Sequence, residues 1–267
     1  MISVCMATYN GSKYIEEQIQ SILKQIGDHD EIIISDDGSK DDTLLIIKAI
    51  NDPRIKVFIN KGIHGFTHNF ENALSKASGD IIFLSDQDDI WLDNKVKKVL
   101  NALERVDFVT HDCVTVDSKL NILSESRFKD FNIQGGFWKH MLKSRYLGCC
   151  MAFRRNILDV SLPFPVRDDL VEHDIWIAAV AFRYFSYSLI DEPLIYYRRH
   201  DTNASEGGFT NGYSIWNKIY RRIYRLKMIE GLKACGKINR GGVILPYNFR
   251  SYVNGDFPGN LLMEVSA

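Results

Sequence analysis

The stretch IIFLSDQDDIW, from Ile81 to Trp91, joins an apolar run to three carboxylates in four residues. The run Asp80–Ser85 predicts a buried strand, and apolar residues at helical spacing predict a helix over Asn94–Val106. The same order of short strand and amphipathic helix precedes this stretch, with strands Ile2–Ala7, Glu31–Ser35 and Arg54–Ile59 and helices Tyr14–Ile26, Asp41–Ile50 and Phe66–Ala77. Repeated units of this kind predict an α/β fold with a mostly parallel sheet flanked by helices.

The second half of the chain has a less regular pattern. Its apolar runs predict strands Phe108–Val116, Leu147–Phe153 and Leu194–Tyr197, a hairpin strand at Lys119–Leu123, and helices Gly135–Leu142, Leu170–Phe182 and Tyr213–Lys233. Residues 241–267 have weak periodicity, which predicts an irregular tail. We therefore expect one domain over 1–212, with halves 1–106 and 107–212, followed by a helical segment at 213–240.

The composition excludes several classes of protein. With 267 residues, 45% of them hydrophobic and 25% charged, the chain is neither collagen-like nor wholly disordered. It contains no run of the roughly 20 apolar residues that a membrane span needs, and its first residues do not resemble a signal peptide. The five cysteines are odd in number and lack metal-ligand spacing. We expect reduced thiols and a cytoplasmic protein.

The total charge of −1 hides an asymmetry along the chain. Residues 1–212 carry −7 with histidine neutral, whereas residues 213–240 carry +7. A basic amphipathic helix of this kind can lie peripherally on an anionic membrane surface. Packing against the chain's own domain or against a second subunit, as in a homodimer, explains the pattern equally well. RNA binding is a third alternative, although the basic residues stay in one short stretch.

Polar clusters follow three of the predicted strands. They read Thr8-Tyr9-Asn10-Gly11, Ser35-Asp36-Asp37-Gly38-Ser39 and Ser85-Asp86-Gln87-Asp88-Asp89. Ligands bind at the carboxyl ends of parallel strands, so we expect the three clusters to form one site. Turns and helix caps alone would also explain the first two, and a solvated acidic turn with a helix cap would explain the third. The acids of the third repel one another, and Mg²⁺ or Mn²⁺ would compensate them while bridging substrate phosphates.

Two further polar clusters lie in the second half. A predicted helix begins with Glu172-His173-Asp174-Ile175-Trp176. The helix dipole stabilises acidic side chains at such a position. The segment also offers a carboxylate base beside an aromatic wall. Tyr197-Arg198-Arg199-His200 follows a predicted strand, and its cations suit a diphosphate or a metal site. The chain has neither a Walker lysine loop nor a GxGxxG fingerprint after the first strand, which argues against P-loop and dinucleotide-binding proteins.

These motifs together resemble glycosyltransferase family 2, inverting enzymes of the GT-A fold that use nucleotide-sugars. The resemblance covers about residues 1–205 and rests on the three clusters and on Gly79-Asp80. The rhamnosyltransferase-like branch of bacterial surface-polysaccharide enzymes is the most similar, on the segments Asp86–Trp91, Leu147–Phe153, His173–Trp176 and Tyr197–His200. One departure is His173-Asp174, where the family more commonly has Glu-Asp.

The resemblance implies a role for each matching residue. Tyr9 matches the aromatic that stacks on the base, and Asp37, with its neighbour Asp36, matches the carboxylate that reads the pyrimidine. Asp174 matches the catalytic base. Asp86 is expected at the ribose or sugar, and Asp88 and His200 are expected to hold Mn²⁺ or Mg²⁺. The remaining implied residues are Thr8, Asn10, Asn69 and Gln87 for the nucleotide-sugar, and Gly148, Cys149 and Trp176 for the acceptor region.

The implied function is transfer of rhamnose or a hexose from a UDP- or dTDP-linked donor to a glycan acceptor. The resemblance places that acceptor on a lipid, in O-antigen or capsule synthesis, at the inner face of the cell membrane. A nucleotidyltransferase is an alternative, but Thr8–Gly11 is not its Gly-rich basic loop. A catalytically inactive nucleotide-sugar-binding subunit is another, and the presence of Asp86, Asp88 and Asp174 argues against it.

Overall fold

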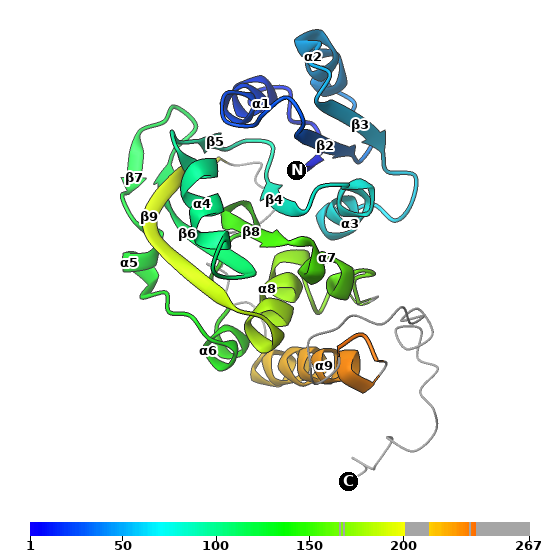
Figure 1. Cartoon of the computed structure of the whole chain (residues 1–267), viewed down its shortest axis with the longest axis vertical. Coiled ribbons are helices and arrows are strands. Elements are labelled where there is room, and N and C mark those ends of the chain that lie inside the picture. The colour runs from blue at the N-terminus through cyan, green and yellow to red at the C-terminus, as the bar shows by residue number, and fades with distance from the viewer. Residues whose placement is uncertain (166, 168, 201–213, 235, 239–267) are drawn as a thin grey trace.

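A computed structural model describes residues 1–165, 167, 169–200, 214–234 and 236–238 (Figure 1). The strands are β1 (Ile2–Thr8), β2 (Glu31–Asp36), β3 (Ile55–Ile59), β4 (Ile81–Ser85), β5 (Ile90–Trp91), β6 (Phe108–Val116), β7 (Ile122–Ser124), β8 (Met151–Arg154) and β9 (Tyr187–Arg198). The helices are α1 (Ile15–Leu23), α2 (Thr43–Ile50), α3 (Phe66–Lys76), α4 (Lys95–Leu103), α5 (Arg127–Phe131), α6 (Phe137–Leu142), α7 (Arg155–Ser161), α8 (His173–Tyr184) and α9 (Ile215–Ala234).

The strands form one sheet in the order β3-β2-β1-β4-β8-β6-β9-β5, with β7 beside β6. The predicted parallel half is confirmed, because β1 pairs in parallel with both β2 and β4, and β2 with β3. β8 lies antiparallel between β4 and β6, and so joins the two halves. Gly79 allows β4 to start close to β1, since a Cβ there would lie 2.7 Å from the backbone nitrogen of Ser3.

Two apolar clusters cover the two faces of the sheet. Val4 and Met6 of β1 pack in the cluster that contains α1, α2 and α4, whereas Cys5 between them packs in the cluster with α3, α7, α8 and α9. This alternation is the period-2 pattern of a strand that is buried on both faces. Helices on both faces leave the carboxyl ends of the strands as the open edge of the sheet.

Several predicted boundaries in the second half are wrong. The segment Leu147–Phe153 begins with a 3₁₀ turn at Gly148–Cys150, and β8 follows it. The strand predicted at Leu194–Tyr197 is only the end of β9, which is twelve residues long. β9 contains Asp191, Glu192 and Pro193 ahead of the predicted segment, and the strand continues there through a register shift against β6. β5, α5 and α7 were not predicted.

The basic helix predicted at Tyr213–Lys233 is confirmed as α9. Its second half packs on the chain's own domain, where Met228, Ile229 and Leu232 are buried. An ion pair of 2.8 Å joins Glu230 to Arg183 of α8. The tail predicted at 241–267 lies outside the described residues.

The sequence predicts neither a membrane-spanning helix nor disulfides. Over the described part of the chain, no helix combines the length and the apolar character that crossing a bilayer requires. Cys5, Cys113, Cys149 and Cys150 are buried free thiols, in line with the expected reduced state. Cys235 is not among the described residues.

Candidate active site

A cavity of about 660 Å³ opens at the carboxyl edge of the sheet. The loops after β1, β2 and β4 all line it, so the three polar clusters converge as predicted. The start of α8 lines it from the second half of the chain. The predicted residues on its wall are Thr8, Tyr9, Asp37, Asn69, Asp86, Gln87, Asp88, Gly148 and Asp174.

Asp36 and Asn10 do not line this cavity, which corrects the prediction that they bind the ligand directly. Asp36 is fully buried, and its carboxylate accepts hydrogen bonds from the Thr8 hydroxyl (2.9 Å) and the Ser39 hydroxyl (2.6 Å). The Oδ1 of Asn10 accepts from the backbone N–H of Lys40 at 2.9 Å. Both side chains hold the first two loops together. Asp36 binds Thr8 before the first loop, and Asn10 binds Lys40 after the second.

Asp37 and Tyr9 both line the cavity. The Asp37 carboxylate accepts from Asn60 Nδ2 and from the backbone N–H of Gly65, both at 2.8 Å, which fixes its direction. Tyr9 is half exposed at the rim. Gln87 ties it to the acidic loop, since its Oε1 accepts from the Tyr9 N–H (2.9 Å) and its Nε2 donates to the Tyr9 carbonyl (3.1 Å).

The acidic loop, residues 86–89, is held from the end of β9. The Arg198 guanidinium donates to the Asp88 carbonyl at 2.8 Å, and the Arg198 backbone N–H donates to Asp89 Oδ1 at 3.0 Å. His200 Nε2 lies 2.8 Å from Asp88 Oδ2, so the two predicted metal ligands are neighbours. Burial and the Asp88 charge raise the pKa of Asp86 to about 7. The loop is thus crowded with carboxyl groups that a cation would stabilise.

Cys149 is buried beneath this loop, not exposed in an acceptor region. Its carbonyl accepts from the buried Lys95 ammonium at 3.0 Å, and its thiol lies within 4.8 Å of carboxylate oxygens of Asp86 and Asp89. The Lys95 ammonium also sits 4.1 Å from the centroid of the Trp91 ring. Lys95 therefore places an ammonium under the acids, and burial lowers the pKa of that ammonium to about 8. Cys149 was predicted for the acceptor region, whereas its side chain is buried under the acidic loop.

Asp174 lies in the first turn of α8 and lines the cavity. Burial, followed by the charge of Glu172, raises the pKa of the Asp174 carboxyl from 3.8 to about 8. The neighbouring His173 ring stacks on Phe70 with centroids 4.1 Å apart, and burial lowers its pKa to about 3. A carboxyl with a raised pKa beside a neutral imidazole suits general-base chemistry near neutral pH.

Trp176 is fully buried in the core, which contradicts its prediction as an aromatic wall for the acceptor. Its indole N–H donates to the Ser161 carbonyl at 2.9 Å, so the side chain fastens α8 to α7. We expect Trp176→Ala to lower the free energy of unfolding by about 3–5 kcal/mol, as for other fully buried aromatics. Urea unfolding of the variant checks this, and an unchanged midpoint would contradict the core position.

The comparisons with known proteins can be set against this geometry. The sequence profile described as Glycosyl transferase family 2 matches residues 3–162, more than half of the chain. The chain belongs to glycosyl transferase family 2. This membership confirms the resemblance drawn from the motifs, and it leaves the nucleotidyltransferase alternative without support.

Two curated members of the family match most of the chain. An Escherichia coli UDP-Glc:alpha-D-GlcNAc-diphosphoundecaprenol beta-1,3-glucosyltransferase, WfaP, is 30% identical over 251 residues, covering 89% of this chain and 90% of WfaP. The dTDP-rhamnosyl transferase RfbG of Shigella flexneri is 28% identical over 244 residues, 81% of each chain. Against two other family members that are 34% identical over shorter stretches, the chain aligns with less than half of the relative's length.

Two solved structures show the same fold. S. aureus TarS 1–349 in complex with UDP-GlcNAc superposes with a TM-score of 0.61 at 20% identity, covering 86% of this chain and 66% of TarS. The mannosyltransferase PcManGT of Pyrobaculum calidifontis, in complex with GDP-Man and Mn²⁺, gives 0.55 at 21% identity, covering 87% and 68%. The predicted GT-A architecture is thereby confirmed.

Several other residues line the cavity, and none of them was assigned a role in binding or catalysis from the sequence. Phe66 and Phe70 line the cavity from α3, and Glu172, His173 and Tyr197 line it from the second half. Phe66 and Phe70 stand four residues apart, a spacing that predicts a core face equally well. Glu172 and His173 had one usable signal, which is their position directly before the expected base. Lys40 and His64 are further polar residues of the wall that were not predicted.

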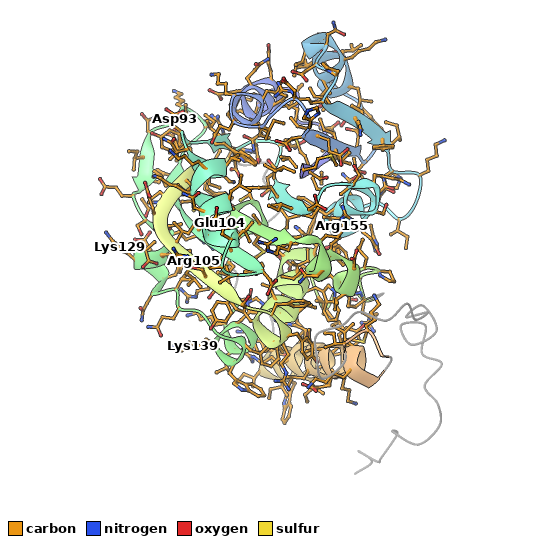
Figure 2. The ribbon with its side chains drawn as sticks, in the orientation of Figure 1. Asp93, Glu104, Arg105, Lys129, Lys139 and Arg155 are labelled. Atoms are coloured by element: carbon orange, nitrogen blue, oxygen red, sulfur yellow. The ribbon has the colours of Figure 1, made fainter. Side chains whose placement is uncertain are left out.

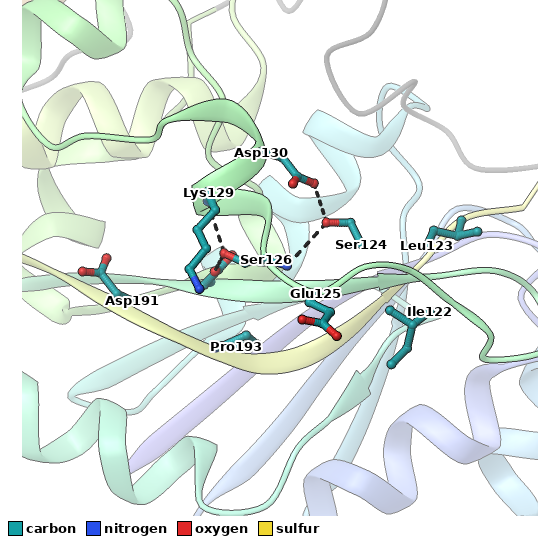
Figure 3. A pocket seen from close by; sticks show the side chains of 10 residues that line it. Ile122, Leu123, Ser124, Glu125, Ser126, Lys129, Asp130, Asp191 and Pro193 are labelled. Atoms are coloured by element: carbon teal, nitrogen blue, oxygen red, sulfur yellow. Dashed lines mark hydrogen bonds between the residues drawn. The ribbon is translucent and has the colours of Figure 1, made fainter.

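A second hollow, of about 580 Å³, lies beside β7 and α5 (Figure 3). Its wall carries acidic side chains, with Asp130 accepting a hydrogen bond from Ser124. The buried Asp112 carboxylate at its base accepts from the backbone N–H groups of Cys113 and Phe128. None of the predicted site residues lines this hollow.

Proposed function

We propose that this protein is an inverting, metal-dependent glycosyltransferase that uses a nucleotide-diphosphate sugar in bacterial surface-polysaccharide synthesis. One observation carries the proposal: a single cavity is lined by Tyr9 and Asp37, by the acidic loop and by Asp174. An aromatic and a carboxylate suit a nucleoside base, and a carboxyl of raised pKa suits an acceptor hydroxyl.

The nucleotide end favours a pyrimidine. The Asp37 carboxylate is fixed by two donors and still faces the cavity, so it can accept the N3–H of uracil or thymine. Tyr9, at the rim, can stack on the ring. Asn69 anchors the same loop, because its Nδ2 donates to the Thr8 carbonyl at 3.0 Å. The names of two relatives contain UDP-Glc and dTDP-rhamnosyl. The bases of both nucleotides are pyrimidines, which supports a pyrimidine donor for this chain.

The residues of the acidic loop fit a divalent cation. Asp88 and His200 offer a carboxylate oxygen and an imidazole nitrogen 2.8 Å apart, and Asp86 lines the same wall. The adjacent Asp89 has a buried Oδ2 for which the described residues provide no partner. Oxygen-rich sites with one imidazole suit Mn²⁺, and Mg²⁺ accepts the carboxylates. When bound, such a cation neutralises the negative charge that develops on the leaving diphosphate.

Asp174 performs the proton transfer in this proposal. The acceptor oxygen attacks the anomeric carbon while its proton moves to the Asp174 carboxylate. The bond from the anomeric carbon to the diphosphate oxygen breaks, and its electron pair leaves with the nucleoside diphosphate. Attack opposite the leaving group inverts the anomeric centre in one step. A single carboxylate base suffices, in contrast to the paired carboxylates of glycoside hydrolases.

The acceptor follows from the relatives by similarity. WfaP acts, by its name, on a sugar linked to diphosphoundecaprenol. A lipid-linked glycan acceptor is therefore the class we propose for this chain, with rhamnose or a hexose as the transferred sugar. Gly148 lines the cavity beside Asp174. A Cβ at this position would lie 3.0 Å from His173 Nε2, so there is little room for a side chain here.

A thermal-shift screen tests the donor site. UDP, dTDP, GDP and CMP are each added with Mn²⁺ or with EDTA. We expect stabilisation by UDP or dTDP only in the presence of Mn²⁺, and about 2.7 kcal/mol when the ligand stands at 100 times its Kd. No shift with any nucleotide on folded protein would contradict the proposal. Release of nucleotide from the matching donor sugar then separates a working enzyme from an inactive binding subunit.

A further inference from the structure

Exposed apolar side chains gather where α6 meets the first half of α9. We call these residues the α6–α9 patch: Trp138 and Leu142 on α6, with Ile215, Trp216, Ile219 and Tyr220 on α9. Trp216 is 80% exposed, Ile215 74%, Trp138 66% and Leu142 65%. Large apolar side chains are rarely this exposed on a helix face that remains in contact with water.

The two helices of the patch touch each other. The Arg222 guanidinium of α9 donates to the carbonyls of Met141 (3.3 Å) and Leu142 (2.6 Å), at the end of α6. Figure 1 shows α6 beside the N-terminal end of α9 at one pole of the molecule, away from the parallel half of the sheet. The patch is therefore one continuous surface formed by segments far apart in the sequence.

The charges around the patch are positive. Residues 132–147 and 214–229, which carry it, contain no Asp or Glu. Lys139 and Lys143 are exposed on the α6 side, and Figure 2 shows Lys139 at this outer edge. Lys218 and Lys227 stand on α9. The first acid beyond the patch on α9, Glu230, is paired with Arg183. An apolar surface with a basic border complements an anionic bilayer.

The arginines of α9 have a different role from the one that the sequence suggested. Arg221 and Arg225 are buried against the domain, so they do not face a lipid surface. Arg221 donates to the Asp169 carbonyl, and its guanidinium lies 3.9 Å from the Glu172 carboxylate. Glu172 lines the cavity next to Asp174. Arg221 thus joins α9, which carries part of the patch, to Glu172 on the cavity wall.

We propose that the α6–α9 patch seats this protein on an anionic membrane surface, with Trp138 and Trp216 in the interfacial layer and the lysines at the headgroups. The inference rests on the proposed function, since a lipid-linked acceptor would explain why the patch lies on a helix that contacts the cavity wall through Arg221 and Glu172. Tryptophan favours such an interface because its ring is apolar and its N–H can still reach water.

Co-sedimentation of the full chain with vesicles tests the proposal. The vesicles are phosphatidylglycerol mixed with phosphatidylcholine, or phosphatidylcholine alone. We expect wild type to bind the anionic vesicles, and Trp138→Ser/Trp216→Ser to bind them at least about tenfold more weakly. Lys139→Gln/Lys143→Gln should weaken binding chiefly at low salt. The matched control is Ile122→Ser/Leu123→Ser on β7, which removes two apolar side chains of similar exposure and should bind as wild type does.

The possible outcomes separate the membrane from other occupants. Equal vesicle binding by wild type and the tryptophan variant overturns the proposal, and so does a wild type that binds no vesicles. Gel filtration that shows the tryptophan variant dissociating an oligomer also overturns it, in favour of a second copy on the patch. Transfer to a water-soluble acceptor should be equal in both proteins. Vesicle binding without any sugar transfer would contradict the proposed function alone.

Discussion

Asp174→Asn should lower the rate of sugar transfer by roughly 10²–10⁴-fold, the usual effect of losing a general base. Asparagine keeps the shape of the side chain and its place at the start of α8, but it cannot take the proton of the acceptor hydroxyl. Nucleotide binding should survive, because Tyr9 and Asp37 stand on the loops after β1 and β2 and not on α8. Initial rates of product formation, combined with the thermal shift by UDP or dTDP, separate the two effects.

The pH dependence gives a second signature of the same carboxyl. Because the pKa of Asp174 rises from 3.8 to about 8 on folding, kcat/KM of wild type should rise about tenfold per pH unit below 8. The same shift means that the folded state binds an extra proton. The free energy of unfolding therefore falls as pH rises from about 4 to 8, and Asp174→Asn should remove that fall.

A matched substitution controls for the loss of a negative charge. Asp159→Asn removes an exposed carboxyl from α7 and should leave transfer and nucleotide binding unchanged. Transfer by Asp174→Asn at a near-wild-type rate would mean that another group accepts the proton. Glu172 is then the first candidate, because its carboxyl lines the same wall.

The sequence predicts the first half of the fold well because local and global signals agree there. β1, β2 and β4 are continuous apolar runs buried on both faces, and each is followed by polar residues at the same edge. That agreement is also why the cavity could be located. The second half mixes parallel and antiparallel pairings, and β9 contains Pro193 where it shifts register against β6. Such irregular pairing leaves no simple period in the sequence.

Burial separates the predicted site residues into two groups, and the sequence could not. Asp36 and Asp37 are neighbours of the same type, yet Asp36 turns inward to bind Thr8 and Ser39, whereas Asp37 lines the cavity. Trp176 stands two residues after Asp174 but points into the core. Which of two adjacent side chains meets a ligand depends on the loop's path and on helix phase, which only tertiary packing determines.

Removal of the carboxylate of Asp88, the proposed metal ligand, should have the second large effect. Asp88→Asn keeps the size of the side chain but removes the negative charge that faces His200 at 2.8 Å. If a divalent cation supplies several kcal/mol of transition-state stabilisation, transfer should fall by more than about a hundredfold. His200→Gln should weaken metal binding about ten- to hundredfold, a smaller effect that added Mn²⁺ can overcome. Transfer rates over a Mn²⁺ titration, started from EDTA-treated protein, measure both variants.

Asp93→Asn is the control for this loop. Asp93 is exposed a few residues further along, before α4, so its loss should leave the Mn²⁺ titration unchanged (Figure 2). Wild-type transfer that persists undiminished in EDTA would contradict metal dependence. In that case the charge on the leaving diphosphate would have to be met by the protein's own cations near the loop. Lys95, buried under Asp86 and Asp89, would then be the first residue to test. The Asp88 and His200 substitutions would lose little activity under that alternative, so the same titration decides between the two.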